Sequence, residues 1–227
     1  MSGLDPLTTV IGYVVLIFSI IVHENAHGLT AEYFGDPTAR ALGRITMNPI
    51  PHVDIFGSIL VPLVAMSQGL MFGWAKPVPV NSLNLRNPVV HNAYVAAAGP
   101  ISNLLLALAG SILLIVVAVV FDLAPGLDAA TSRSFVFFNT MCGALIMWNT
   151  VLALFNLLPI PPLDGHWILM RFLPPGPREA LASIGRFGFL ILIVLMVTGI
   201  LWRILALPVT LTVNAYYWFI NTVVGFL

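Results

Sequence analysis

The stretch VIGYVVLIFSIIVHENAHGLTAEYFGD, residues 10–36, sets both the fold class and the chemistry of this chain. Residues 10–22 carry no charge, and with their neighbours they predict a membrane-spanning helix. His23 and His27 are four residues apart, so they lie on one helix face, a spacing that lets two imidazoles bind one zinc ion. Glu24 is placed to act as general base towards a metal-bound water. An ionisable group inside a membrane segment is a functional candidate by default.

The composition extends the membrane prediction to the whole chain. Of the 227 residues, 59% are hydrophobic and 8% charged, against about 25% charged in soluble domains. The net charge is zero, so no nucleic-acid partner is implied. The one cysteine, Cys142, lies in an apolar run and is expected to pack there. Residues 1–22 have no basic start and no cleavage site, so we expect them to stay as the first helix.

Apolar runs mark the expected membrane segments. They fall at about 7–34, 55–74, 95–121, 135–158, 187–204 and 206–226. The run 55–74 contains Pro62 and Gly69, so it either spans or dips in and returns as a re-entrant hairpin. We expect an all-α polytopic membrane protein with about five to six membrane helices or re-entrant segments. A short β or re-entrant element on the cytosolic side, with strands at 45–47 and 78–80, is expected between the first helix and the one carrying Gly99.

The basic residues favour one topology. If 55–74 does not cross and the first helix runs inwards, seven of the nine basic residues lie in the cytosol: Arg40, Arg44, Lys76, Arg86, Arg171, Arg178 and Arg186. If 55–74 does cross, four lie inside and five outside. The positive-inside rule therefore favours the re-entrant interpretation.

A catalytic zinc site needs a third protein ligand, and Asp164 is the leading candidate. It follows a long apolar run and a Pro-rich stretch that breaks the helix. In the favoured topology this run ends on the cytosolic side, at the depth expected for His23 and His27. Taken alone, Asp164 fits a turn residue in a Pro-Leu-Asp-Gly turn better than a ligand.

Three motifs together resemble the site-2 proteases, the intramembrane zinc metalloproteases: HENAH at 23–27, GPISN at 99–103 and NLLPIPPLDG at 156–165. The stretches at 35–54 and 72–81 are similar to the small bacterial branch that lacks PDZ and CBS domains. The resemblance covers most of residues 10–190. It implies one membrane-embedded metalloprotease domain over 1–227, with a catalytic core at about 7–172 and C-terminal helices at about 185–227.

The resemblance also implies roles for individual residues. His23, His27 and Asp164 would hold one Zn²⁺ per chain, and Glu24 would be the base and proton shuttle. Asn156 would hold the substrate or stabilise the oxyanion, since a side-chain amide suits that task. Gly99 and Asn103 would mark the helix packed against the metal helix. The implied substrate is a transmembrane or signal-peptide segment of a membrane protein, cut in a prokaryotic inner or plasma membrane with the site towards the cytosol.

Other polar residues have plainer interpretations. His52 and Asp54 fit an interfacial turn better than the site, His91 and Glu32 fit the surface, and His166 is a weaker candidate for a partner of a zinc ligand. The aromatic run at 216–219 fits an interfacial or lipid-facing belt. Two other functions stay open, a non-catalytic zinc-binding relative and a zinc or proton transporter. The oligomeric state is open.

Overall fold

The computed structural model describes residues 6–54, 57, 76–123 and 132–226, and in them the chain is helical. Five helical stretches are long and apolar enough to cross a membrane: Pro6–Tyr33, Pro88–Leu123, Arg133–Asn156, Pro175–Val197 and Ile200–Gly225. The prediction of an all-α membrane protein is confirmed at this level. The predicted runs 7–34 and 135–158 match the first and third of these within two residues, and 95–121 lies inside the second, which begins seven residues earlier.

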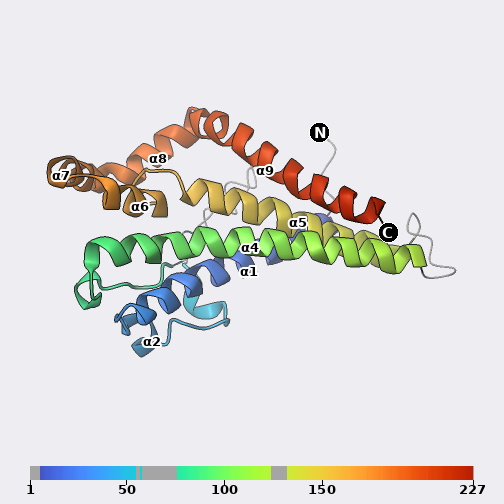
Figure 1. Cartoon of the computed structure of the whole chain (residues 1–227), viewed down its shortest axis with the longest axis horizontal. Coiled ribbons are helices and arrows are strands. Elements are labelled where there is room, and N and C mark those ends of the chain that lie inside the picture. The colour runs from blue at the N-terminus through green and yellow to red at the C-terminus, as the bar shows by residue number, and fades with distance from the viewer. Residues whose placement is uncertain (1–5, 55–56, 58–75, 124–131, 227) are drawn as a thin grey trace.

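The centre of the fold is a bundle of three helices, α1 (Pro6–Tyr33), α4 (Pro88–Leu123) and α5 (Arg133–Asn156). The long helix α4 packs against both of the others (Figure 1). Small side chains allow this approach, because lipid offers no hydrophobic force between helices and contact depends on close packing. A Cβ added at Gly110 of α4 would lie 2.8 Å from the Cβ of Leu145 of α5.

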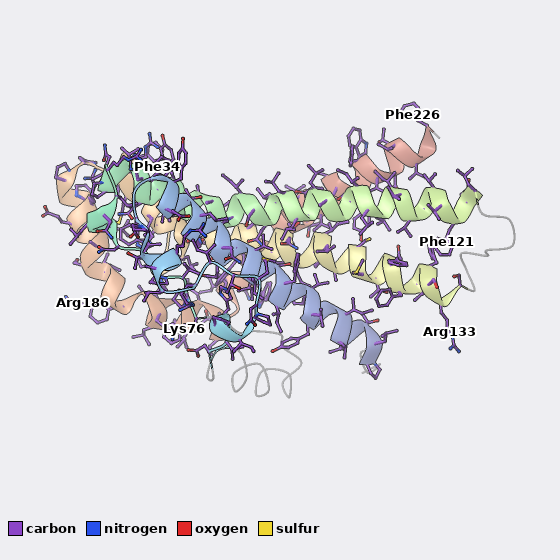
Figure 2. All side chains as sticks on the ribbon, turned by 90° about the horizontal axis from the view of Figure 1, so that it is seen from below. Phe34, Lys76, Phe121, Arg133, Arg186 and Phe226 are labelled. Carbon is purple, nitrogen blue, oxygen red and sulfur yellow. The ribbon has the colours of Figure 1, made fainter. Side chains whose placement is uncertain are left out.

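The chain returns to the same end of the bundle between α1 and α4. The backbone N–H of Arg86 donates to the Phe34 carbonyl over 3.1 Å, and the Phe34 ring stacks on His91 in the first turn of α4. Phe34 and Lys76 lie at one end of the molecule, and Phe121 and Arg133 lie at the other (Figure 2). α1 and α4 are therefore antiparallel. The run 55–74, predicted to be re-entrant, lies outside the described residues except for Gly57.

Within residues 34–54 and 76–87, the connection between α1 and α4 includes the short helical turns α2 (Thr38–Ala41), η1 (Ile50–His52) and η3 (Ser82–Asn84). The described part of this connection contains no strand, so the strands predicted at 45–47 and 78–80 are wrong. The backbone groups are used elsewhere. The Thr46 carbonyl accepts from the side chains of Asn25 and His52, and the Val78 N–H donates to the Glu24 carboxylate.

After α5 the chain forms α6 (Asp164–Phe172), α7 (Pro175–Ile184), η4 (Gly185–Phe187), α8 (Gly188–Val197) and α9 (Ile200–Gly225). The predicted boundary between runs 187–204 and 206–226 is wrong. The break lies at Gly199, whose φ of +72° ends α8, whereas hydropathy is continuous across it. Arg186 and Phe226 lie at opposite ends of the molecule (Figure 2).

Candidate metal centre

His23 and His27 project from one face of α1 towards the start of α6. Their rings meet edge to face, with centroids 4.6 Å apart. Asp164, the first residue of α6, places one carboxylate oxygen 3.2 Å from Nε2 of His23 and the other 3.4 Å from Nε2 of His27. The candidate ligand atoms of the three residues all lie within 4.8 Å of one another. The structure thus brings the three predicted ligands together.

In both histidines Nδ1, the ring nitrogen that points away from Asp164, is hydrogen-bonded to an oxygen acceptor. Nδ1 of His27 lies 2.7 Å from the Val95 carbonyl, and Nδ1 of His23 lies 2.6 Å from Oδ1 of Asn103. A carbonyl oxygen only accepts, so each Nδ1 donates, and the neutral form of each ring then has its lone pair on Nε2. In that form both Nε2 atoms face the Asp164 carboxylate as acceptors.

This arrangement of acceptors fits a zinc ion. Oδ2 of Asp164 is buried and has no hydrogen-bond partner, and three converging acceptors repel unless a cation lies between them. Zinc bonds of about 2.0–2.1 Å in a tetrahedron place neighbouring ligand atoms ~3.3 Å apart. Each Nε2 lies near that distance from one oxygen of the carboxylate, 3.2 Å from Oδ2 for His23 and 3.4 Å from Oδ1 for His27. Two imidazoles and one carboxylate form the donor set of a catalytic zinc site with a fourth position left for substrate or water.

Two glycines make the close approach of three helices possible. A Cβ at Gly99 of α4 would lie 2.5 Å from ring atoms of both His23 and His27. A Cβ at Gly165, next to Asp164, would lie 2.2 Å from the Leu157 carbonyl oxygen at the end of α5. Gly99 therefore lets α4 lie against the histidine rings, and Gly165 lets the start of α6 lie against the end of α5.

Glu24 and Asn156 border a cavity of about 310 Å³ that also contains the three ligands. The Glu24 carboxylate accepts a 2.6 Å hydrogen bond from the backbone N–H of Val78, which lies in the wall opposite α1. Asn156, the last residue of α5, donates from Nδ2 to the Leu152 carbonyl. An amide nitrogen carries two hydrogens, so one remains for a ligand in the cavity.

Residues 11–145 and 120–195 match the family described as Peptidase family M50. The chain belongs to this family. It is 41% identical over 196 residues to "Putative zinc metalloprotease YwhC" of Bacillus subtilis (strain 168), over 85% of this chain and 84% of the relative. It is 32% identical over 204 residues to "Putative zinc metalloprotease Rip2" of Mycolicibacterium smegmatis, a match that covers 87% of this chain and 72% of the relative. No solved structure matches the chain to a significant degree.

The match confirms the resemblance to site-2 proteases, because M50 is the family of those enzymes. The chain is an M50 zinc metalloprotease homologue. Its relatives are bacterial, and its helices are long enough for a membrane protein.

The weaker candidates from the sequence are hydrogen-bonded to groups other than the three ligands of this M50 site. His166 bonds through Nδ1 to the Leu163 carbonyl, and His52 bonds through Nε2 to the Thr46 carbonyl. Asp54 accepts from the Gly57 N–H. Glu32 lies five residues past His27 on α1 and accepts from the Arg40 guanidinium. In the aromatic run, Trp218 is exposed, but the Tyr216 hydroxyl donates to the Leu104 carbonyl of α4, so Tyr216 packs between helices.

Three contributors to the site were not foreseen. Ser19 and Asn149 are fully buried polar residues, and Asn149 bonds both Ser19 and Asn103, the partner of His23. Val78 contributes a backbone N–H, which bonds Glu24. The signal for the first two was available, since a polar side chain within a membrane helix faces the bundle interior. No side-chain signal could identify Val78.

Proposed function

We propose that the chain is an intramembrane zinc endopeptidase that hydrolyses peptide bonds in transmembrane or signal-peptide segments of membrane proteins. The observation that carries this is the meeting of His23, His27 and Asp164 in one cavity with the carboxylate of Glu24. His23 is about 26 Å along α1 from Pro6, at 1.5 Å per residue, and α1 itself is apolar enough to span. The site thus sits within the length of a membrane helix.

The residues divide the chemistry as follows. His23, His27 and Asp164 would hold the zinc ion, which would act as a Lewis acid towards a substrate carbonyl and would lower the pKa of a bound water. Glu24 takes the proton from the attacking water and returns it to the leaving nitrogen. The free hydrogen of the Asn156 amide donates to the oxygen on which negative charge develops.

The cavity wall supports an extended substrate. Pro77, Val78 and Val80 line it without regular secondary structure. Pro77 and Pro79 have no N–H and the Val78 N–H bonds Glu24, so this backbone would pair with a substrate mainly through carbonyls. A substrate must be unwound here, because helical carbonyls are already hydrogen-bonded. We propose that an unwound segment lies along this wall as an added strand.

The charge distribution supports a site near the cytosol of a bacterial cell. Lys76 and Arg186 lie at the end of the molecule opposite Arg133 (Figure 2). Arg44 bonds the Lys76 carbonyl, and Arg171 stacks on Tyr94 of α4, which places these cations at the same end as Lys76 and Phe34. The positive-inside rule assigns that end to the cytosol.

The test is Glu24→Gln in the purified protein with a labelled peptide carrying one transmembrane segment. We expect cleavage to fall by about 10²–10⁴, the usual contribution of a general base. Zinc content should stay near one per chain, because Glu24 is not a ligand. The matched control is Glu32→Gln, on the same helix but paired with Arg40, which should cleave normally. Undiminished cleavage by Glu24→Gln refutes the proposed base, and zinc binding without cleavage in the unaltered chain favours a non-catalytic relative.

A further inference from the structure

Three polar side chains from three helices form a buried chain of hydrogen bonds that ends at His23. Ser19 of α1, Asn103 of α4 and Asn149 of α5 each have 0% exposure. Asn149 Nδ2 donates to Ser19 Oγ over 2.8 Å, and Asn103 Nδ2 donates to Asn149 Oδ1 over 2.8 Å. The last link joins Asn103 Oδ1 to His23 Nδ1 at 2.6 Å.

The direction of each bond is fixed by backbone carbonyls, which can only accept. Ser19 Oγ donates its single hydrogen to the Val15 carbonyl, so it accepts from Asn149. The second hydrogen of Asn149 Nδ2 goes to the Leu145 carbonyl, 2.9 Å away. Asn149 therefore presents its oxygen to Asn103, and Asn103 in turn presents its oxygen to His23.

The two metal histidines are consequently held in different ways. Nδ1 of His27 donates directly to the main-chain carbonyl of Val95, which cannot be exchanged for a donor. Nδ1 of His23 meets a side-chain amide, and an amide turned by 180° would offer a donor instead of an acceptor. His23 would then carry its hydrogen on Nε2 and lose the lone pair that faces Asp164.

We infer that Asn149 is a positioning residue for the metal ligand His23, acting through Asn103 and held in its own orientation by Ser19. It touches neither substrate nor metal ligand. The inference rests on the zinc site of the proposed function. It assigns a role to a residue of α5 that lies outside the three sequence motifs.

The experiment measures zinc affinity of the full chain in detergent by competition with a chromophoric chelator. Loss of a hydrogen-bond partner of a metal ligand weakens metal binding about 10–100-fold. The zinc affinity of Asn103→Leu should fall by a factor in that range, and that of Asn149→Leu by a factor near its lower end. The double variant should bind zinc no more weakly than Asn103→Leu alone, because Asn149 acts only through Asn103. The matched control is Thr150→Val, a fully buried neighbour on α5 whose hydroxyl donates to the Ile146 carbonyl of its own helix, and it should bind zinc normally.

A rescue variant keeps the test valid if Asn149→Leu does not fold. Asn149→Asp, buried as the neutral acid, still accepts from Asn103 and donates to Ser19, so its zinc affinity should stay within about threefold of the unaltered chain. Ser19→Ala should weaken zinc binding, whereas Ser111→Ala should not, because Ser111 is equally buried but bonds only the Ala107 carbonyl.

Additive losses in the double variant, equal losses in Thr150→Val, or unaltered affinity in both Asn149→Leu and Ser19→Ala would overturn the inference. Failure of the proposed function gives a different result. If the unaltered chain binds zinc but cuts no peptide, the proteolytic role fails while the variant affinities still test Asn149.

Discussion

Replacing Gly99 by alanine tests whether the metal site depends on the contact between α1 and α4. The added Cβ would lie 2.5 Å from ring atoms of His23 and His27, and ordinary contact begins at 3.4 Å. The rings or the helices must therefore separate by about 0.9 Å. Zinc–ligand distances tolerate only about 0.2 Å. The two histidines cannot both keep their places relative to Asp164.

The size of the effect follows from the cost of overpacking. An extra methyl in a close-packed site costs about 1–3 kcal/mol, which corresponds to a loss in zinc affinity of about 5- to 160-fold if the rings move. Without the clash, alanine should stabilise the helix by about 1 kcal/mol relative to glycine. The loss in the free energy of zinc binding should therefore be much larger than any loss in the free energy of unfolding of the metal-free protein.

The assay is chelator competition for zinc, with thermal unfolding of the metal-free chain measured beside it. Gly143→Ala is the control, because its Cβ would meet only the Tyr217 hydroxyl at 3.6 Å, an ordinary contact. Zinc affinity of Gly99→Ala within twofold of the unaltered chain would refute the inferred contact.

Two further outcomes concern acid and metal. Burial alone would raise the pKa of Asp36, but hydrogen bonds from Thr38, Asn84 and the Asn81 N–H outweigh it and hold that pKa below its usual value. The carboxylate therefore stabilises the fold above pH ~3.9, and this contribution is lost as the pH falls through the lowered pKa. Asp36→Asn should be less stable than the unaltered chain at neutral pH, and its stability should fall less as the pH is lowered. The measurement is the unfolding midpoint of both proteins as a function of pH. Two curves that stay parallel would contradict the prediction. Chelation of zinc should lower the free energy of unfolding by about 2.7 kcal/mol relative to zinc at 100 times its Kd, and an unchanged midpoint would exclude a zinc site in the folded state.

The sequence predicted the parts of the fold that depend on local patterns. The positions of α1, α4 and α5 follow from apolar length, because a membrane helix must satisfy its own backbone. The start of α4 at Pro88, seven residues before the predicted run 95–121, does not follow from it. The break at Gly199 could not be predicted, since hydropathy does not register one left-handed residue between two apolar helices. The absent strands show the same limit, because the N–H of Val78 bonds a carboxylate that is distant in sequence.

The candidate site was predictable where residue type carries the signal. His23 and His27 follow from helical spacing, and Asp164 from its place after a helix break. Asn149 could not be assigned a role, because its effect depends on which way another residue's amide points. That orientation is a property of three packed helices.

The chain of bonds through Ser19 and Asn149 also bears on how the protein is made. These residues are 130 positions apart, and Asp164 is synthesised later still. A nascent chain that has inserted only α1 and α4 therefore carries two histidines without their carboxylate partner and without the support of α5. Completion of the metal site must await insertion of α5 and arrival of α6. An unfinished chain that ends before α6 thus lacks a complete metal site.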